Sequence, residues 1–215
     1  GPNGAGKTTL FNLLSGVFKP TAGRVIFRGR DITPLPPHRI AHLGIGRSFQ
    51  ITNVFPNLTV FENVRLAAQA MGRDSLNLIA PASHFREYEK RAQEVLGRVG
   101  LSDKAAALAS TLAHGDKRKL EIGILLASDP EVLLLDEPTA GMASEQVPQL
   151  MALIAEIRQQ GNKTILLVEH NMDVVMNVSD AITVMHYGKV LAEGTPAEIA
   201  ANEQVQKAYL GELYH

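Results

Sequence analysis

Eight consecutive residues of the sequence have the types and the spacing that bind phosphate groups. They read Gly1-Pro2-Asn3-Gly4-Ala5-Gly6-Lys7-Thr8, which matches G-x-x-x-x-G-K-[ST], and an apolar helical pattern follows. Glycines let backbone N–H groups turn inward around an anion, and the helix N-terminus adds partial positive charge. The Lys7 ammonium can reach the outer phosphates of a nucleotide, and the Thr8 hydroxyl can bind Mg²⁺. The alternative is a glycine-rich turn that only caps a helix.

Two adjacent acids, Asp136 and Glu137, follow the apolar run Val132–Leu135. A continuous apolar run predicts a strand that is buried on both faces, and ligands bind in the crevice at the carboxyl ends of such strands. In a chain with a phosphate loop, Asp136 is expected to hold Mg²⁺ directly or through water. Glu137 is expected to orient or deprotonate the water that attacks the terminal phosphate. The alternative is that Asp136 only caps a turn before Pro138.

The rest of the sequence predicts the elements that position these residues. Short β-branched runs alternate with helical periodicity, which favours an α/β fold with a mainly parallel sheet. We expect strands at Arg24–Phe27, Ile45–Phe49, Val132–Leu135, Thr164–Val168, Ala181–Met185 and Lys189–Ala192, the last two joined by a hairpin turn. We expect helices at Lys7–Leu14, Val60–Met71, Phe85–Val99, Lys117–Ala127, Glu145–Gln160, Met172–Asn177, Pro196–Ala201 and Glu203–Leu210.

The segment from residue 60 to about residue 128 is expected to be helical throughout. At its start, Thr59 and Glu62 match a capping box, in which each side chain accepts a hydrogen bond from an N–H group of the first turn. Strands resume at Val132. We therefore predict one domain over residues 1–215, with a mainly helical subdomain inserted at about residues 60–128.

Composition argues against several classes of protein. Lysine and arginine number 21 against 22 aspartates and glutamates, so the net charge of −1 gives no sign of a nucleic-acid partner. The sequence contains no cysteine, which excludes disulfides and thiolate metal sites. Its longest apolar runs, such as Ile122–Ala127, are far shorter than the roughly 20 residues that span a bilayer.

Three more features occur in a fixed order along the chain. Gln50 ends an expected strand, Leu112-Ala113-His114-Gly115-Asp116 opens a helix, and His170 follows the strand Thr164–Val168. Together with the phosphate loop and the Asp136-Glu137 pair, this order resembles the nucleotide-binding domain of ABC transporters, which has a P-loop NTPase core. The resemblance covers essentially all 215 residues.

The resemblance implies that the chain hydrolyses ATP with Mg²⁺ as the metal. Glu137, His170 and Gln50 would be its catalytic residues, and Thr8, Gln50 and Asp136 would bind the metal. The segment 112–116 would be the signature motif, which caps the γ-phosphate of the ATP held by the opposite subunit. The residues expected to bind ATP are Gly1, Pro2, Asn3, Gly4, Ala5, Gly6, Lys7, Thr8 and Thr9 in the phosphate loop, and Ala113, His114 and Gly115 in the signature motif.

The signature motif departs from the family's commonest sequence, L-S-G-G-Q. Ala113 replaces the serine, His114 the first glycine and Asp116 the glutamine, while Gly115 is retained. An acid beside a phosphate is repulsive, so we expect weaker or pH-sensitive capping. The loop after Pro138 also departs, with Ala143 where many family members have aspartate.

Further segments resemble the ATP-binding subunits of branched-chain amino acid importers. They are Asp31-Ile32-Thr33, Leu35-Pro36-Pro37-His38-Arg39-Ile40, Gly46-Arg47-Ser48-Phe49-Gln50, Phe55-Pro56-Asn57-Leu58-Thr59-Val60-Phe61-Glu62-Asn63-Val64, Ala140-Gly141-Met142 and Lys207-Ala208-Tyr209-Leu210-Gly211-Glu212. Two alternatives remain open: the ATPase of a urea or short-amide importer, and a soluble ABC-type ATPase that is not linked to transport. Phe55 and Leu58 are expected either in the core or in a groove that receives a membrane subunit.

The resemblance also implies partners and a location. The expected partners are a second nucleotide-binding subunit, identical or paralogous, two transmembrane permease subunits and a periplasmic or extracellular solute-binding protein, with no nucleic acid. The expected location is the cytoplasmic face of the bacterial inner membrane. Family members carry a few tens of residues before the phosphate loop, so we expect the N-terminal strands of the fold to be missing. A fragment that binds nucleotide poorly is a third alternative.

Overall fold

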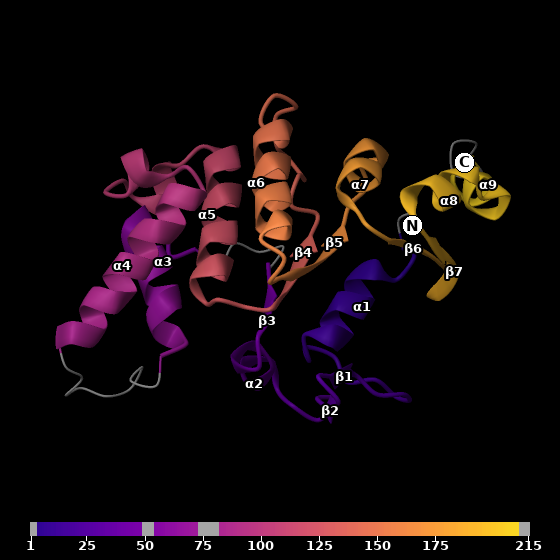
Figure 1. The fold of residues 1–215 in the computed structure, drawn as a ribbon, viewed down its shortest axis with the longest axis horizontal. Coiled ribbons are helices and arrows are strands. Elements are labelled where there is room, and N and C mark those ends of the chain that lie inside the picture. The colour runs from indigo at the N-terminus through magenta and orange to yellow at the C-terminus, as the bar shows by residue number, and fades with distance from the viewer. Residues whose placement is uncertain (1–3, 49–53, 73–81, 211–215) are drawn as a thin grey trace. The chain divides into compact units, whose positions relative to one another are not determined.

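The computed structural model describes residues 4–48, 54–72 and 82–210. The chain divides into two compact units, one made of Gly1–Pro37 with Leu167–His215 and the other made of His38–Leu166. Figure 1 labels the helices and strands of both units. Strand β5 (Thr164–Val168) carries the chain from the second unit into the first.

The first unit contains helix α1 and two antiparallel hairpins. α1 spans Lys7–Leu14, as predicted, and Gly16 follows it in a left-handed conformation with a φ of 74°. The hairpin strands are β1 (Ile26–Phe27) with β2 (Arg30–Asp31), and β6 (Ile182–His186) with β7 (Lys189–Gly194). The remaining helices are α7 (Met172–Val178), α8 (Pro196–Ala201) and α9 (Glu203–Leu210).

Both hairpins turn through two residues with positive φ. The values are 52° and 74° at Arg28 and Gly29, and 46° and 75° at Tyr187 and Gly188. Two consecutive positive φ values define the type I′ turn, whose twist matches that of the strands it joins. The second turn confirms the predicted hairpin. The first was missed, because Arg-Gly is not among the dipeptides that signal such a turn, and the predicted strand Arg24–Phe27 is shorter than expected.

The last elements of the first unit share a small apolar core. Ile182, Val184, Ile199 and Val205 are buried together there. Figure 1 shows α8 and α9 folded against β7. α8 begins at a capping box in which the Glu198 N–H group donates to the Thr195 hydroxyl at 3.4 Å. The core therefore fixes the hairpin whose turn reaches the phosphate loop.

A three-stranded sheet organises the second unit. Its order is β3-β4-β5, and β3 (Ile45–Arg47) pairs in parallel with β4 (Val132–Asp136). The three leucines of β4, Leu133–Leu135, are at most 1% exposed. Helix α5 (His114–Ala127) packs so tightly on β3 that a Cβ atom at Gly46 would lie 2.5 Å from the Leu125 Cδ1 atom. The α/β fold with a parallel sheet is confirmed.

Three helices pack together in the second unit: α3 (Val60–Ala70), α4 (Ala82–Arg98) and α5 (Figure 1). The predicted capping box is present, because the Glu62 N–H group donates to the Thr59 hydroxyl at 3.1 Å and the Thr59 N–H group donates to Glu62 Oε2 at 2.9 Å. Regular structure is helical throughout the described part of residues 60–128, and the limits of a helical subdomain stay a prediction. The other helices are α2 (Pro37–His42), α6 (Val147–Gln159) and the 3₁₀ turns Ser102–Lys104 and Ala109–Thr111.

Two helices differ from the predictions in ways that concern function. α5 begins at His114, one turn before the predicted start at Lys117. Histidine, glycine and aspartate are weak helix formers, so local propensity favoured the later start, whereas tertiary packing of Gly115 stabilises the earlier one. Helix α2 was missed altogether.

Among the described residues, no helix combines the length and the apolar character that crossing a membrane requires.

Candidate functional site

The phosphate loop leads directly into α1 in the first unit. Gly4 has a φ of 73°, and Gly6, the N-cap of α1, has a φ of 95°. Only glycine adopts such angles without steric cost, so both positions need it. The Gly6 carbonyl accepts the Leu10 N–H group at 2.9 Å. The N–H groups of the first turn of a helix point toward its N-terminus, where they can bind an anion. The first turn carries no acidic residue that would compete for them.

Lys7, Thr8 and Thr9 form that first turn, where Lys7 and Thr8 are half-buried and Thr9 is exposed. Gly1, Pro2 and Asn3 lie outside the described residues. The described part of the loop thus has the features that phosphate binding needs: glycines with positive φ, a helix N-terminus and a lysine beside it.

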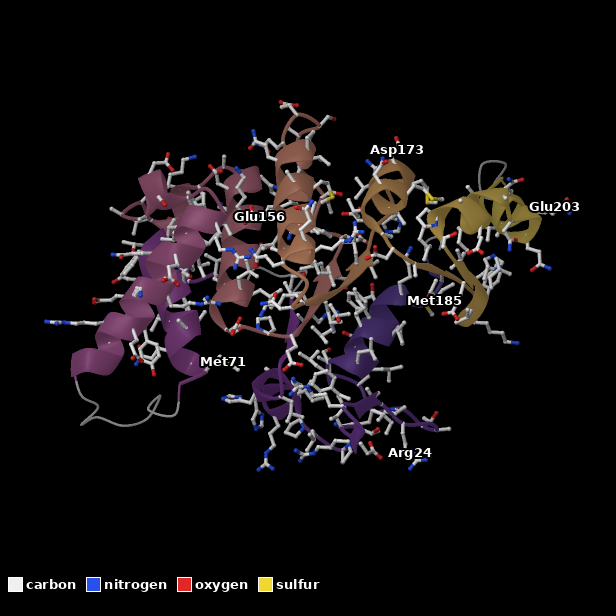
Figure 2. The ribbon with its side chains drawn as sticks, in the orientation of Figure 1. Arg24, Met71, Glu156, Asp173, Met185 and Glu203 are labelled. Atoms are coloured by element: carbon white, nitrogen blue, oxygen red, sulfur yellow. The ribbon has the colours of Figure 1, made fainter. Side chains whose placement is uncertain are left out.

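The turn between β6 and β7, which comes near the C-terminal end of the chain, contacts the phosphate loop. The Gly188 N–H group donates to the Ala5 carbonyl oxygen at 3.0 Å, and Ala5 is only 2% exposed. A Cβ atom at Gly6 would lie 3.4 Å from the Gly188 Cα atom and 3.6 Å from the Cε atom of Met185, which Figure 2 labels. The phosphate loop is therefore held by a hairpin that is far from it in the sequence but in contact with it in the fold.

Asp136 ends strand β4 in the second unit, and its side chain is fully buried. The Arg47 guanidinium donates from Nη2 to Asp136 Oδ2 at 3.2 Å, and the Arg47 side chain is itself only 8% exposed. Ser48 joins the same strand ends, because it accepts the Asp136 N–H group at 3.2 Å and donates its own N–H group to the Leu134 carbonyl oxygen at 2.9 Å. The carboxylate is thus placed by two strands.

Glu137 follows with a φ of 49°, in the left-handed region. Residues with a Cβ atom pay about 1–2 kcal/mol for this conformation, which favours glycine or asparagine. The Glu137 carbonyl oxygen accepts the Ala140 N–H group at 3.0 Å, which closes the turn. A strained acidic residue beside a buried carboxylate is a typical functional arrangement.

The signature motif forms the first turn of α5. Ala113 is the N-cap, and without a side-chain hydroxyl it makes no capping hydrogen bond. His114 lies against the loop after β4, because a Cβ atom at Gly141 would be 3.3 Å from the imidazole Nε2 atom. Gly115 is buried under Gln146, whose Oε1 atom would be 2.5 Å from a Cβ atom at Gly115.

Asp116 is paired with two cations. The Lys104 ammonium donates to Asp116 Oδ2, and the Lys119 ammonium lies 3.9 Å from Oδ1. The hydrogen bond to Asp116 raises the pKa of Lys104 above its ordinary value, so this lysine keeps its charge. The expected repulsion between Asp116 and a phosphate is therefore offset within the subunit itself.

His170 lies after β5 in the first unit and is exposed. Its backbone N–H group donates to the carboxylate of the buried Glu169 at 3.2 Å. Asn171 then caps α7 by accepting the Val174 N–H group at 3.2 Å. Gln50, predicted to be both catalytic and metal-binding, lies outside the described residues.

Four residues that shape the site carry little signal in the sequence. Arg47 and Gly188 stand inside recognised segments, but nothing in those segments shows which atoms they contact. Lys104 and Gln146 belong to no motif, and only the folded chain brings them to Asp116 and Gly115.

Two of the predicted metal ligands, Thr8 in the first unit and Asp136 in the second, have side chains of the kind that bind magnesium. Mg²⁺ takes one or two protein oxygens and completes its shell with phosphates and water. A threonine hydroxyl and a buried aspartate are such hard oxygen donors. Within residues 4–48, 54–72 and 82–210, no three His, Cys, Asp or Glu side chains gather into a metal cage. The chemistry of these two donors, each taken by itself, is compatible with Mg²⁺.

Comparison with known proteins places the chain in a family. The sequence model of the ABC transporter family matches residues 1–140, and that of the branched-chain amino acid ATP-binding cassette transporter matches residues 189–215. The branched-chain amino acid transport ATP-binding protein LivG of Salmonella typhimurium is 46% identical over 99% of this chain and 85% of its own length. Its counterpart BraF of Pseudomonas aeruginosa is 43% identical over the same shares.

Solved structures agree with the sequence comparison. The ADP conformation of an ATP-binding cassette of an ABC transporter superposes with a TM-score of 0.81 at 29% identity, covering 98% of this chain and 85% of that one. A family model over more than half of the chain and relatives above 40% identity point the same way. The chain therefore belongs to the ABC transporter family, as one of its ATP-hydrolysing ATP-binding cassettes.

Proposed function

We propose that this chain hydrolyses ATP to power an importer of branched-chain amino acids. The names of LivG and BraF support the cargo, as does the family match at residues 189–215. The single observation that carries the chemistry is Glu137, which is held with a φ of 49° directly after the buried Asp136.

Each predicted site residue then has a role in phosphoryl transfer. The backbone of residues 1–6, through the N–H groups of the residues other than Pro2, and the Lys7 ammonium would bind the phosphates, with Thr9 beside them. The Thr8 hydroxyl, the Asp136 carboxylate and Gln50 would hold Mg²⁺, which supplies positive charge that neutralises the phosphate oxygens. Catalysis of this kind is positioning and electrostatic stabilisation of an in-line attack by water.

Water attack needs a base and a group that senses the terminal phosphate. Glu137 would orient or deprotonate the water, and His170 would contact the γ-phosphate. Ala113, His114 and Gly115 would cap the γ-phosphate of an ATP bound by a second nucleotide-binding subunit. Two such subunits would close on two ATP molecules and drive a pair of permease subunits, with a solute-binding protein delivering the cargo outside the cytoplasmic membrane.

The hydrolytic role predicts the behaviour of Glu137→Gln. This change keeps the shape of the side chain but removes the base, so ATP turnover should fall by about 100-fold or more while ATP stays bound. The measurement is phosphate release together with the nucleotide retained after gel filtration. The exposed Glu145, eight residues on, provides the matched control Glu145→Gln, which should turn over normally. Turnover of Glu137→Gln within twofold of the parent protein would remove Glu137 from the mechanism.

The cargo is tested by transport rather than by hydrolysis. The chain is expressed with the permease and binding-protein genes beside its own gene, in cells that lack other uptake systems for leucine and urea. Uptake of labelled leucine that depends on Lys7 is expected. Uptake of urea without leucine would reassign the chain to the short-amide importers, and Lys7-independent uptake of both would contradict the proposal.

A further inference from the structure

The Arg47–Asp136 ion pair is a deeply buried contact between opposite charges at the end of strand β4. The side chains are 8% and 0% exposed, and Nη2 of the arginine donates to Oδ2 of the aspartate at 3.2 Å. The ion pair between Lys163 and Asp129 in the same unit is more open, because the Asp129 side chain is 71% exposed. The Arg47 pair therefore differs in kind from a surface salt bridge.

Burial makes the pairing obligatory in the absence of another cation. Moving a lone carboxylate out of water costs several kcal/mol, so a buried carboxylate needs a counter-charge. Arg47 supplies that charge through one oxygen of Asp136. The same carboxylate is the one that the proposed function assigns to Mg²⁺.

Backbone geometry holds the arginine in place. Parallel pairing sets Arg47 beside Leu134 on the neighbouring strand. Ser48, the next residue, is hydrogen-bonded to both Leu134 and Asp136, so the end of β3 cannot shift along β4 without breaking these bonds. The backbone of Arg47 is thus held beside the strand that carries Asp136.

We infer that Arg47 is the built-in counter-ion of Asp136, and that its guanidinium and the metal of the nucleotide complex compete for the charge of this one carboxylate. The inference rests on the proposed role of Asp136 in binding Mg²⁺. In the nucleotide-free protein, Arg47 holds the carboxylate as its counter-ion. In the nucleotide-bound protein, two cations share one anion and repel each other.

Thermodynamic linkage determines whether removal of Arg47 should strengthen or weaken metal binding. If metal binding weakens the hold of Arg47 on Asp136, removal of Arg47 must strengthen metal binding by the same factor. Removal must also destabilise the nucleotide-free protein, because an uncompensated charge is left in the interior. A residue that only oriented Asp136 for the metal would have the opposite effect on metal affinity.

The ion pair is tested first in the protein without nucleotide or metal. Arg47→Met, which replaces the charged side chain with a long apolar one, should lower Tm by about 5–15 °C. In an Asp136→Asn background, the same change should lower Tm by less than half as much, because the buried charge is gone. Equal losses in both backgrounds would show that the two charges do not interact. Arg47→Lys, which keeps the charge, should recover part of the loss and serves if Arg47→Met does not fold.

The competition is tested by titrating MgCl₂ into the protein with a fluorescent ADP. The concentration of Mg²⁺ at half-saturation should fall about fivefold or more in Arg47→Met. In Arg47→Lys, this concentration should also differ from that of the parent protein. Arg65→Met is the matched control, because the Arg65 guanidinium on α3 donates to the neutral Gln69 at 2.9 Å, and it should leave both measurements unchanged.

The outcomes separate the inference from the proposed function. A higher half-saturating Mg²⁺ concentration in Arg47→Met overturns the competition and leaves Asp136 as a metal ligand. ADP binding by the parent protein that does not depend on Mg²⁺ overturns the metal role of Asp136 and the competition with it, while the Tm comparison still reports on the ion pair. An unchanged Mg²⁺ dependence in Arg47→Met also overturns the competition.

Discussion

Glu137 has an identity that its motif predicts and a conformation that it does not. A φ of 49° costs a residue with a Cβ atom about 1–2 kcal/mol, and such strain persists only where the surroundings enforce it. Here the buried end of β4 on one side and the Ala140 N–H bond on the other enforce the turn. The fold therefore stabilises an acidic side chain where local preference favours glycine.

Contacts with two lysines change the expected electrostatic effect of Asp116. From the sequence, its charge was expected to oppose a phosphate at the start of α5. In the structure, Lys104 and Lys119 flank its two carboxylate oxygens. Compensation within the subunit allows the helix N-terminus to remain attractive to anions.

This compensation predicts a reversible defect in Lys104→Met. Loss of the ammonium exposes the Asp116 charge to the phosphate that α5 is proposed to cap, so ATP turnover should fall by about fivefold. Asp116→Asn in the same background removes the repulsion and should restore turnover, as measured by phosphate release. A double variant as slow as Lys104→Met would show that the lysine acts otherwise. Lys90→Met, which breaks the exposed pair with Glu94, is the control and should have no effect.

The start of α5 and the loop after β4 form one packed element in the second unit. His114 lies against Gly141, and Gly115 lies under Gln146, so two segments about thirty residues apart touch at two points. Gly141 has a φ of 73°, which already requires glycine there. The signature motif and the loop that departs from the family at Ala143 are therefore joined within a single subunit.

Asp129, which follows α5, forms ion pairs with Lys163 before β5 and with Arg91 on α4. Asp129 accepts from the Lys163 ammonium at 2.6 Å and lies 3.4 Å from Nη2 of Arg91. The hydrogen bond to Lys163, with the charges of Lys163, Arg91 and Arg98, lowers the pKa of Asp129 below its ordinary value of 3.8. Its contribution to stability is thus present above the pKa of the unfolded chain and is lost as pH falls through the lower pKa of the folded state.

Asp129→Asn should therefore lower stability at neutral pH but not in acid. Because Asp129 is exposed and the pairs are screened by solvent, the expected loss in Tm at pH 7 is about 1–3 °C. In thermal unfolding scans, the difference from the parent protein should begin to shrink as pH falls below about 3.8 and should vanish once pH is below the lower pKa of the folded state. Asparagine tolerates the φ of 49° found here, so backbone strain does not confuse the result. A difference that persists in acid would contradict the charge argument, and Asp103→Asn on a 3₁₀ turn is the control.

At the scale of the whole molecule, Phe55 is an exposed aromatic residue to which the proposed mechanism of hydrolysis gives no role. Phe55 is 58% exposed, which excludes the core alternative for this residue, whereas Leu58 is half-buried. The buried Asn63 holds the loop, because its Oδ1 atom accepts the Phe55 N–H group at 2.7 Å and its Nδ2 atom donates to the Phe55 carbonyl oxygen at 3.1 Å. An aromatic group held in solvent by a buried polar residue favours a partner surface.

Phe55→Glu should therefore reduce assembly with the permease and leave the isolated subunit unchanged. Co-purification with the membrane subunits is expected to fall by about tenfold, while ATP turnover of the isolated protein stays within twofold. Val190→Glu, at a similarly exposed apolar residue in the other unit, is the control and should co-purify normally. Normal assembly of Phe55→Glu would remove this loop from the proposed interface.

Most regular elements follow from local sequence, and those that do not share a physical cause. Helix α1, strand β5 and helices α8 and α9 have the predicted bounds, because caps, prolines and β-branched runs mark their ends. The missed strand β2 and the early start of α5 depend on an atypical turn and on packing around a buried glycine. Local preference is a weak guide at such places, since tertiary contacts outweigh it.

The sequence alone was enough to indicate the α/β fold and the family, and to predict the cofactors and the residues that would bind the phosphates. That information is local, because phosphate chemistry requires particular residue types at fixed spacing. Only the folded chain decided that Gly188 braces the phosphate loop, that Lys104 neutralises Asp116 and that Arg47 is buried against Asp136. These contacts join residues 12 to 183 positions apart, and their energies come from burial and charge, which depend on position in space and not on position in the chain.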